Sequence, residues 1–141
     1  MIEIYFDGLC EPNPGGVATY GYVIFQDGKQ IKTGNNVIGK GKGMTNNVAE
    51  YSALLRAFEW IDKQDISEKI TVKGDSRLVI KQMKDDWKIK SDTSKKFVPE
   101  IRNLLRGRTV EFIWIPREEN KEADKLARVA YERYLKERSK I

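Results

Sequence analysis

The sequence has no histidine among its 141 residues and only one cysteine, Cys10. Without histidine the protein has no Ser–His or Cys–His catalytic pair, no histidine general base and few ligands for transition metals. One cysteine excludes an intramolecular disulfide bond and a cysteine-based zinc site. Any hydrolytic chemistry must therefore rest on carboxylates, on lysine, or on ions bound through oxygen, such as Mg²⁺ or Mn²⁺.

Long apolar runs are also missing. No stretch approaches the roughly 20 apolar residues that span a membrane, so we expect no membrane partner. A composition of 40% hydrophobic and 33% charged residues is typical of a soluble globular protein, and the length predicts a single domain over residues 1–141. Because a strand pattern begins at once, we expect no signal or transit peptide and a cytoplasmic protein.

The net charge of +5 is unevenly distributed along the chain. Residues 81–108 include nine basic and four acidic side chains, residues 120–141 include seven and four, and the remainder is net acidic. This asymmetry fits a polyanionic partner that meets one side of the molecule. Ordinary solvated helix faces explain the same charges equally well.

Hydrophobic periodicity and turn residues predict nine elements in the order βββαβααβα. Strands are expected over residues 2–7, 18–25, 30–37, 69–73 and 108–115, and helices over 45–63, 74–84, 93–105 and 120–136. This order predicts an α/β fold with a five-stranded mixed sheet, in which three antiparallel strands are joined to two parallel ones by helical crossovers.

Two carboxylates are expected where strands end. Asp7 precedes Gly8 at the end of the first strand, and Asp75 follows the fourth. Ligands of parallel α/β sheets bind just beyond the carboxyl ends of strands. The alternatives are a turn role for Asp7 and helix N-capping for Asp75.

Two more carboxylates begin helices whose following faces are apolar. A glutamate or aspartate at the head of such a face needs a compensating partner if it is buried. For Glu50 the alternative is a capping box with Asn47 as the cap, and for Asp124 it is a favourable helix dipole. The apolar positions are Ala53, Leu54, Ala57 and Ile61 after Glu50, and Ala127, Tyr131 and Leu135 after Asp124.

Together these acids suggest a metal site made of oxygen ligands alone. Four clustered carboxylates would repel one another and resist ionisation unless cations neutralised them. Two Mg²⁺ ions about 3.5–4 Å apart would do so and would suit in-line displacement at phosphorus.

Four motifs, in order over essentially the whole chain, resemble those of type 1 ribonuclease H, an endonuclease that cuts the RNA of RNA–DNA hybrids. They are Asp7-Gly8 with Asn13-Pro14-Gly15, Thr45-Asn46-Asn47-Val48-Ala49-Glu50, Asp75-Ser76, and Asn120-Lys121-Glu122-Ala123-Asp124-Lys125-Leu126-Ala127.

The resemblance implies that Asp7, Glu50, Asp75 and Asp124 form the catalytic tetrad and hold two Mg²⁺ ions, or Mn²⁺ as a substitute. One ion would activate a water and the other would stabilise the departing 3′ oxygen, which gives 5′-phosphate and 3′-hydroxyl products. Family positions that contact the hybrid fall on Asn13, Thr45, Asn46 and Asn47; loop and cap chemistry is the alternative for each, and capping is the favoured role for Thr45.

The chain departs from the family pattern in two places. The loop before the last helix, where many members carry a histidine that assists product release, has Glu118 and Glu119 instead. Two interpretations stay open: Glu118 or Glu119 takes over this step, or the step is absent. The passage after residue 86 is too short for the basic protrusion of some bacterial members. Trp87 and Lys88 are expected to form a reduced version that binds the hybrid, although core packing is a competing role for Trp87.

The expected partner is an RNA–DNA hybrid, and we expect a monomer. No hybrid-binding domain is expected before the first strand, so affinity should fall steeply with salt. Two alternatives remain open: a broader nuclease that also cleaves double-stranded RNA, and a non-catalytic module that recognises the shape of the hybrid.

Overall fold

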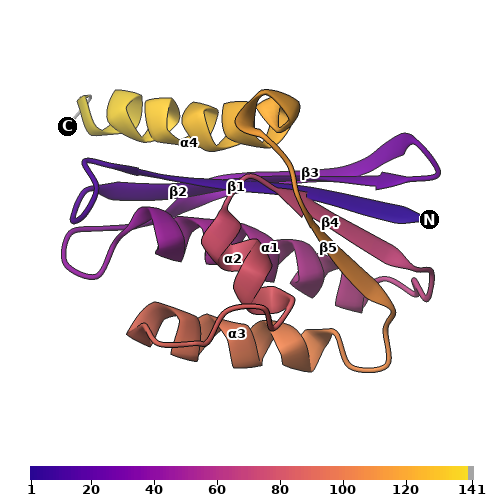
Figure 1. Cartoon of the computed structure of the whole chain (residues 1–141). Coiled ribbons are helices and arrows are strands. Elements are labelled where there is room, and N and C mark those ends of the chain that lie inside the picture. Colours follow the sequence, from indigo (N-terminus) through magenta and orange to yellow (C-terminus); the bar gives the residue numbers. More distant parts are fainter. Residues whose placement is uncertain (140–141) are drawn as a thin grey trace.

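The computed structural model describes residues 1–139 and contains the predicted elements in the predicted order (Figure 1). A single 3₁₀ turn, η1 (Arg117–Glu119), precedes the last helix. The strands are β1 (Ile2–Glu11), β2 (Val17–Gln26), β3 (Lys29–Lys40), β4 (Ile70–Gly74) and β5 (Val110–Trp114). The helices are α1 (Asn46–Lys63), α2 (Arg77–Met83), α3 (Asp92–Leu104) and α4 (Lys121–Ser139).

The five strands form one mixed sheet in the order β3-β2-β1-β4-β5, which confirms the predicted architecture. β1 is central: it pairs antiparallel with β2 along its whole length and parallel with β4 over Ile2–Tyr5. Beyond Tyr5, β2 is the one strand that pairs with β1 within residues 1–139. The carboxyl end of the parallel strand pair therefore opens beside the second half of β1.

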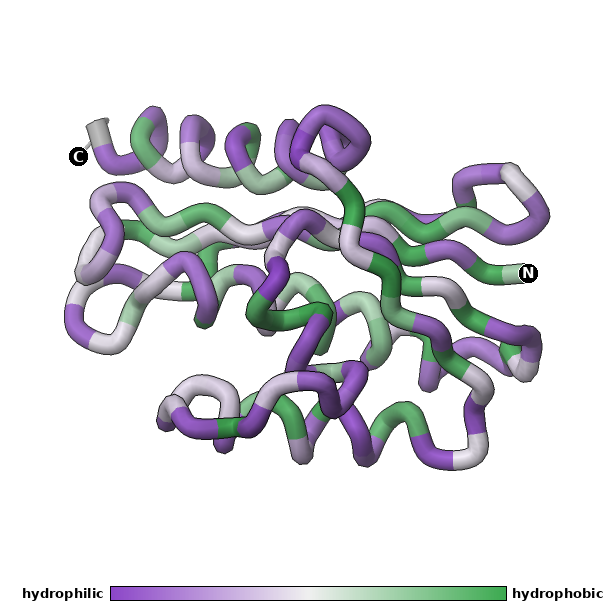
Figure 2. Tube along the Cα trace, viewed as in Figure 1, coloured by the Kyte–Doolittle hydropathy of each residue, from purple (hydrophilic) through white to green (hydrophobic). Residues whose placement is uncertain are grey.

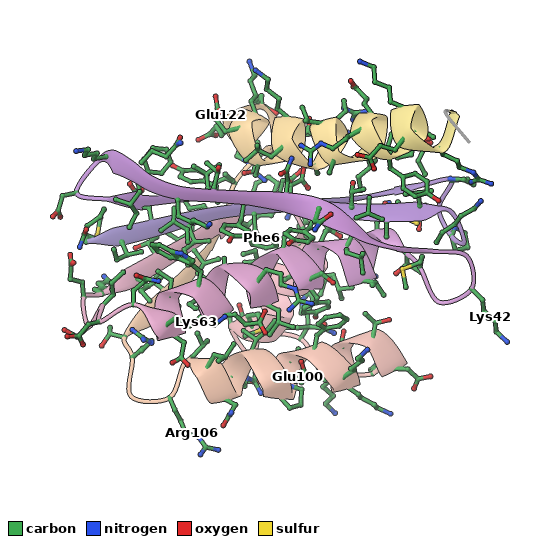
Figure 3. All side chains as sticks on the ribbon, turned by 180° about the vertical axis from the view of Figure 1, so that it is seen from behind. Phe6, Lys42, Lys63, Glu100, Arg106 and Glu122 are labelled. Atoms are coloured by element: carbon green, nitrogen blue, oxygen red, sulfur yellow. The ribbon has the colours of Figure 1, made fainter. Side chains whose placement is uncertain are left out.

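Helices cover both faces of the sheet. α4 lies on one face, α1 and α2 lie on the other, and α3 packs outside α1 (Figure 1). The hydrophobic residues gather along the strands and the inner sides of the helices (Figure 2). Phe6 is buried between the sheet and α1, whereas Lys42 and Arg106 project from loops (Figure 3).

β1 does not end at Asp7, as the sequence had led us to expect. It continues to Glu11, with Asp7 opposite Gly21 and Gly8 opposite Tyr20 of β2. The Asp7-Gly8 pair is therefore not a turn, and Asp7 is a mid-strand residue. β3 is likewise longer than predicted and runs to Lys40, which leaves a shorter loop before α1.

The capping alternatives for the acids were also wrong in detail. The hydroxyl of Thr45 accepts the N–H of Val48 and caps α1, as favoured for Thr45. The hydroxyl of Ser76 accepts the N–H of Val79 and caps α2. Neither Asn47 nor Asp75 is the cap residue, so both side chains are available for other contacts.

α4 buries a different row of residues from the one predicted. Its buried side consists of Ala123, Ala127 and Ala130, whereas Leu135 is 44% exposed. Small residues allow the helix axis to lie close to β2, and the hydroxyl of Thr19 donates to the carbonyl of Ala127 at 2.8 Å. Only Ala127 of the predicted row is fully buried, because the helix is rotated to present its alanine face.

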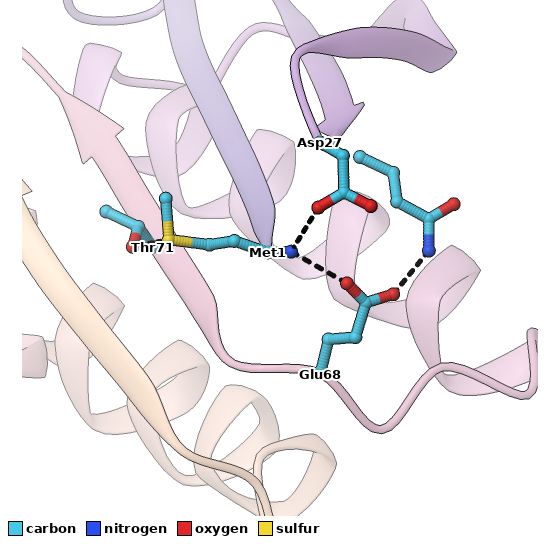
Figure 4. A network of polar contacts seen from close by, with 5 residues as sticks. Met1, Asp27, Glu68 and Thr71 are labelled. Carbon is cyan, nitrogen blue, oxygen red and sulfur yellow. Dashed lines mark hydrogen bonds and ion pairs between the residues drawn. The ribbon is translucent and has the colours of Figure 1, made fainter.

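The start of β1 is tied to two loops by charge. The ammonium group of Met1 lies 2.7 Å from a carboxylate oxygen of Asp27 and 2.7 Å from one of Glu68 (Figure 4). Gln26 also donates to Glu68, so the β2–β3 hairpin and the loop before β4 meet at this point. No helix within residues 1–139 is long and apolar enough to cross a membrane.

Candidate active site

Four acidic side chains from separate parts of the chain line one cavity of about 180 Å³. Asp7 comes from β1, Glu50 from the first turns of α1, Asp75 from the junction of β4 and α2, and Asp124 from the first turn of α4. The structure thus brings together all four acids that were singled out in the sequence. Gly8, Leu9, Asn46 and Arg117 complete the lining.

Two glycines let the helices that carry Glu50 and Asp124 approach the sheet. A Cβ atom on Gly8 would lie 2.3 Å from the backbone nitrogen of Glu50, and one on Gly21 would lie 2.5 Å from the carbonyl oxygen of Ala123. Contacts this short do not occur with a real side chain. The absence of a side chain at each glycine therefore sets how closely the acids converge on Asp7.

Asp7 is 7% exposed and has acidic neighbours. Burial, followed by the nearby charge of Asp75, raises the pKa of Asp7 from 3.8 to about 8. The backbone N–H of Gly8 donates to its carboxylate at 2.9 Å and acts in the opposite direction. In the absence of cations, Asp7 therefore favours its protonated form at neutral pH.

Glu50 behaves in the same way. Burial, followed by the charge of Asp75, raises the pKa of Glu50 from 4.5 to about 8, and a hydrogen bond with Ser76 opposes that rise. The residues predicted to follow Glu50 on the inner face of α1 are fully buried, which explains why this carboxylate is drawn out of water.

Asn120 holds Asp75 in place and was not singled out in the sequence. It is 1% exposed and occupies the position before α4, where an asparagine would normally cap the helix with its side-chain oxygen. Instead its amide nitrogen donates to Asp75 at 2.9 Å and to the carbonyl of Phe6 at 2.8 Å. Its buried Oδ1 has no hydrogen-bond partner within residues 1–139. The side chain therefore links the central strand to an acid of the cavity.

The donor set suits hard cations. Carboxylate oxygens are preferred by Mg²⁺ and Mn²⁺, and cations would relieve the repulsion that keeps Asp7 and Glu50 protonated. Within residues 1–139, however, no three Asp, Glu, Cys or His side chains stand at a spacing that would by itself hold a metal ion. Ion binding would therefore require the carboxylates to adjust.

The asparagines expected to contact substrate are linked at the rim of the cavity. Asn13 accepts the backbone N–H of Asn46 at 3.1 Å, and the side chain of Asn46 accepts the N–H of Cys10 at 2.9 Å. Asn46 also lines the cavity, and Asn47 follows it in the first turn of α1. The bonds use the side-chain oxygens of Asn13 and Asn46 and leave their NH₂ groups to other partners.

Trp87 and Lys88 lie in the loop between α2 and α3. Trp87 is 46% exposed and lines an open hollow of about 480 Å³ together with Lys88 and Lys90. Trp87 is therefore not a core residue. This loop belongs to the basic segment 81–108, which lies across the sheet from the other basic segment in α4, so the two do not form one face (Figure 1).

The loop before α4 places its charged residues on two sides. Glu118 and Glu119 line a separate hollow beside Tyr5 and Phe25, whereas Arg117 lines the cavity of the four acids. Sequence reasoning missed Arg117 because nothing in a run of exposed charged residues shows which one faces inward. Asn120 was missed as well, because its place directly before a helix is that of an ordinary N-cap residue.

The chain is similar to known proteins in sequence and in structure. Residues 5–130 match a family model described as reverse transcriptase-like. Ribonuclease HI from Halobacterium salinarum is 34% identical over 130 residues, which cover 92% of this chain and 63% of that protein. A bifunctional protein of Mycobacterium tuberculosis is also 34% identical, with 34% of its length matched. The chain thus spans about one to two thirds of the length of these curated relatives.

Solved structures are similar over nearly their full length. LC11-RNase H1, solved in complex with an RNA/DNA hybrid, is 35% identical with a TM-score of 0.87, and the match covers 96% of this chain and 99% of that one. RNase H1 from Halobacterium salinarum is 34% identical with a TM-score of 0.84, over 93% and 97% of the two chains.

Proposed function

The chain belongs to the ribonuclease H family and is similar to its type 1 members; from this premise we propose that it is an endonuclease that hydrolyses the RNA strand of RNA–DNA hybrids. The observation that carries the proposal is the convergence of Asp7, Glu50, Asp75 and Asp124 on one cavity. A module that only bound a polyanion would gain nothing from four carboxylates facing its ligand.

Two Mg²⁺ ions, or Mn²⁺ in their place, would be held by these four carboxylates. When bound, the ions would activate the attacking water and stabilise the departing 3′ oxygen, which leaves 5′-phosphate and 3′-hydroxyl ends. Asp7, on the central strand of the sheet, would be one of their ligands. Ion binding would displace the protons that burial and the charge of Asp75 favour on Asp7 and Glu50.

The remaining residues would position the substrate. Arg117, beside the acids, would pair with the phosphate that is attacked. The amide groups of Asn13, Asn46 and Asn47 would contact the backbone and 2′-hydroxyls of the RNA strand, because an amide can both donate to and accept from a hydroxyl.

Trp87 and Lys88 would contact the other strand from their exposed loop, Trp87 against a sugar and Lys88 at a phosphate. A role for Glu118 and Glu119 in product release stays a prediction, because both line the neighbouring hollow rather than the acid cavity.

The deciding experiment compares matched RNA–DNA, RNA–RNA and DNA–DNA duplexes with Mg²⁺, with Mn²⁺ and with EDTA. We expect the RNA of the hybrid to be cut with either ion and no cutting in EDTA. Cleavage of RNA–RNA as well would establish the broader nuclease, whereas equal cleavage of DNA–DNA would refute the proposal.

Two variants assign the acids. Asp7→Asn should retain the fold and lose at least about a thousandfold in rate. Asp124→Asn should lose less, because Asp124 is partly exposed at the edge of the cavity and pairs loosely with Arg128, 3.9 Å away. Near-normal turnover by Asp7→Asn would show that the ions bind elsewhere.

A further inference from the structure

Gln82 is a buried polar residue outside the acid cavity. It belongs to α2, is 3% exposed, and is surrounded by α1, α3 and the loop that carries Trp87. An amide buried this deeply costs free energy unless its donor and acceptor groups are all paired. The way in which they are paired shows what the residue connects.

The side-chain oxygen of Gln82 accepts two hydroxyls. One comes from Tyr51 of α1, the residue after Glu50, and the other from Ser94 of α3. The two hydroxyls also lie 3.1 Å from each other, and both residues are fully buried. The acceptor side of the amide is therefore fixed to two helices of the core.

The side-chain nitrogen of Gln82 bonds to the loop that follows α2. It donates to the backbone carbonyl of Lys88 at 3.3 Å, inside the exposed loop. Arg102 of α3 donates to the backbone carbonyl of Gln82 at 3.1 Å and to the carboxylate of Asp85 at 2.7 Å. The first half of the loop is thus held at Asp85 by Arg102 and at Lys88 by Gln82, and Arg102 is itself bonded to Gln82.

This arrangement joins two parts of the molecule that must act on one substrate. Trp87 and Lys88 are exposed and line the open hollow, while Glu50 lines the acid cavity one residue before Tyr51. Residues 84–88 are all exposed, and the backbone N–H groups of Asp86 and Trp87 donate to the carbonyl of Lys81 in α2. Those bonds hold the loop to α2, whereas the side chain of Gln82 joins the loop to Tyr51 of α1.

We propose that Gln82 is a positioning residue that sets the loop of Trp87 and Lys88 at a fixed place relative to the acid cavity, so that the strand bound by the loop delivers its partner strand to the carboxylates. The inference rests on the proposed function, because it assumes that the loop binds the hybrid. It assigns no contact between Gln82 and the substrate. Gln82 acts through the backbone of Lys88.

The test uses Gln82→Met, which keeps the volume of the side chain but removes its hydrogen bonds. Hybrid affinity is measured in an Asp7→Asn background, and KM and kcat are measured with Asp7 intact. We expect the Kd and KM for the hybrid to rise about tenfold, with kcat changed less than about threefold. Ser94→Ala, which removes one hydroxyl from the network, should produce a smaller change of the same kind.

A double-mutant cycle with Trp87→Ala separates positioning from simple loss of stability. If Gln82 acts through the loop, Gln82→Met should weaken binding little further once Trp87 is absent. Thr71→Val is the matched control, since Thr71 is similarly buried but lies in β4, remote from the loop. It should lower the melting temperature and leave the Kd unchanged.

The outcomes separate the two proposals. If the Asp7→Asn protein with Gln82 intact fails to bind the hybrid, the proposed function is wrong. If it binds, and Gln82→Met and Ser94→Ala bind equally well, the role of Gln82 is overturned while the function stands. Losses of affinity that add fully between Gln82→Met and Trp87→Ala would also overturn it.

Discussion

Asp7 and Glu50 have surroundings that favour the uncharged acid over the carboxylate. Burial is the first cause for each, and the charge of Asp75 is the second. In the unfolded chain the same groups would titrate near pH 4. Between about pH 4 and pH 8 the folded protein therefore binds more protons than the unfolded one, so its stability decreases as the pH rises through that window.

The metal-free protein should consequently lose on the order of 5 kcal/mol in the free energy of unfolding between pH 5 and pH 8. Urea unfolding in EDTA at several pH values measures this. Glu68, whose pKa is lowered chiefly by the Met1 ammonium group, has the opposite dependence but acts below that window. Asp7→Asn should flatten the decrease and be the more stable protein at pH 8; a stability that rose from pH 5 to pH 8 would contradict the expectation.

Asn120 gives a second prediction at the scale of one residue. Asn120→Ala removes the donor to Asp75 and leaves the carbonyl of Phe6 unpaired in the core, so we expect a loss of about 1–3 kcal/mol in stability and weaker Mg²⁺ binding. Calorimetric titration with Mg²⁺ measures the second effect.

Asn35→Ala is the matched control for Asn120→Ala. Asn35 also donates to a backbone carbonyl, that of Leu126 at 2.8 Å, but it does not belong to the lining of the acid cavity. It should lower stability without changing Mg²⁺ affinity. Equal Mg²⁺ affinities for the Asn120→Ala protein and the unaltered protein would show that Asn120 is a structural residue only.

The four acids could be found from the sequence because their positions in the predicted elements, and their resemblance to family motifs, pointed to one place. Arg117 and Asn120 could not. The direction of the Arg117 side chain depends on how the chain bends between β5 and α4. The role of Asn120 depends on whether its side chain caps α4 or turns toward the sheet. A choice of this kind is decided by tertiary contacts rather than by local preference.

At the scale of elements, the contact between β1 and α1 is set by Gly8. Gly8→Ala would place a methyl group 2.3 Å from the backbone of Ala49 and Glu50, so α1 must move away from the sheet. We expect a loss of about 1–3 kcal/mol in stability, together with a marked loss of activity because Glu50 moves with the helix. Chemical denaturation and hybrid cleavage at saturating substrate measure the two effects.

Gly39→Ala is the control for Gly8→Ala, because its new methyl group would meet only the flexible side chain of Met44, at 3.3 Å. It should change stability by a few tenths of a kcal/mol and leave cleavage unaffected. Similar effects of the two substitutions would show that Gly8 does not set the position of α1.

The order and type of all nine elements were predictable, since alternation marks the strands and helical spacing marks the helices. The end of β1 was not. Gly8 carries the usual signal of a turn, but here the glycine serves close packing against a helix that begins more than 35 residues later. The sequence around Gly8 contains no local trace of that helix.

At the scale of the whole molecule, we expect the distribution of basic residues to determine which side binds the hybrid. α4 and the segment 81–108 are both basic but lie on opposite sides of the sheet (Figure 1). Only the second includes the loop of Trp87 and Lys88. We therefore expect hybrid binding to depend strongly on salt and to involve the lysines of one side.

The logarithm of the hybrid affinity of the Asp7→Asn protein should fall linearly with the logarithm of salt concentration, and Lys88→Ala should reduce that slope by about 0.9. Arg133→Ala, an exposed site on α4, should leave the slope unchanged. Fluorescence anisotropy between about 50 and 200 mM salt measures both. Equal slopes for the two variants would contradict a one-sided contact.

The order of the elements predicted the mixed sheet, but it did not predict which helices cover which face of that sheet. α1, α2 and α3 lie on one side of the sheet and α4 lies on the other (Figure 1). The alanine face of α4 shows why: it fits close to β2, whereas the predicted row with Tyr131 and Leu135 would have required a thicker layer. The shape of the sheet decides which of the two apolar faces of α4 packs against it. A single sequence does not reveal that shape.

β1 is bonded to strands on both sides only at Ile2–Tyr5. In hydrogen–deuterium exchange, amides of that stretch should be among the last to exchange, because their release requires global opening. Asp7 lies two residues beyond, where β2 is the one strand paired with β1 among the described residues, and amides there can be released by local opening. The amides of residues 2–5 therefore serve as an internal reference for those of residues 7–11 in the same strand. A ligand that fills the acid cavity should slow exchange at residues 7–11 and leave the exchange of residues 2–5 unchanged.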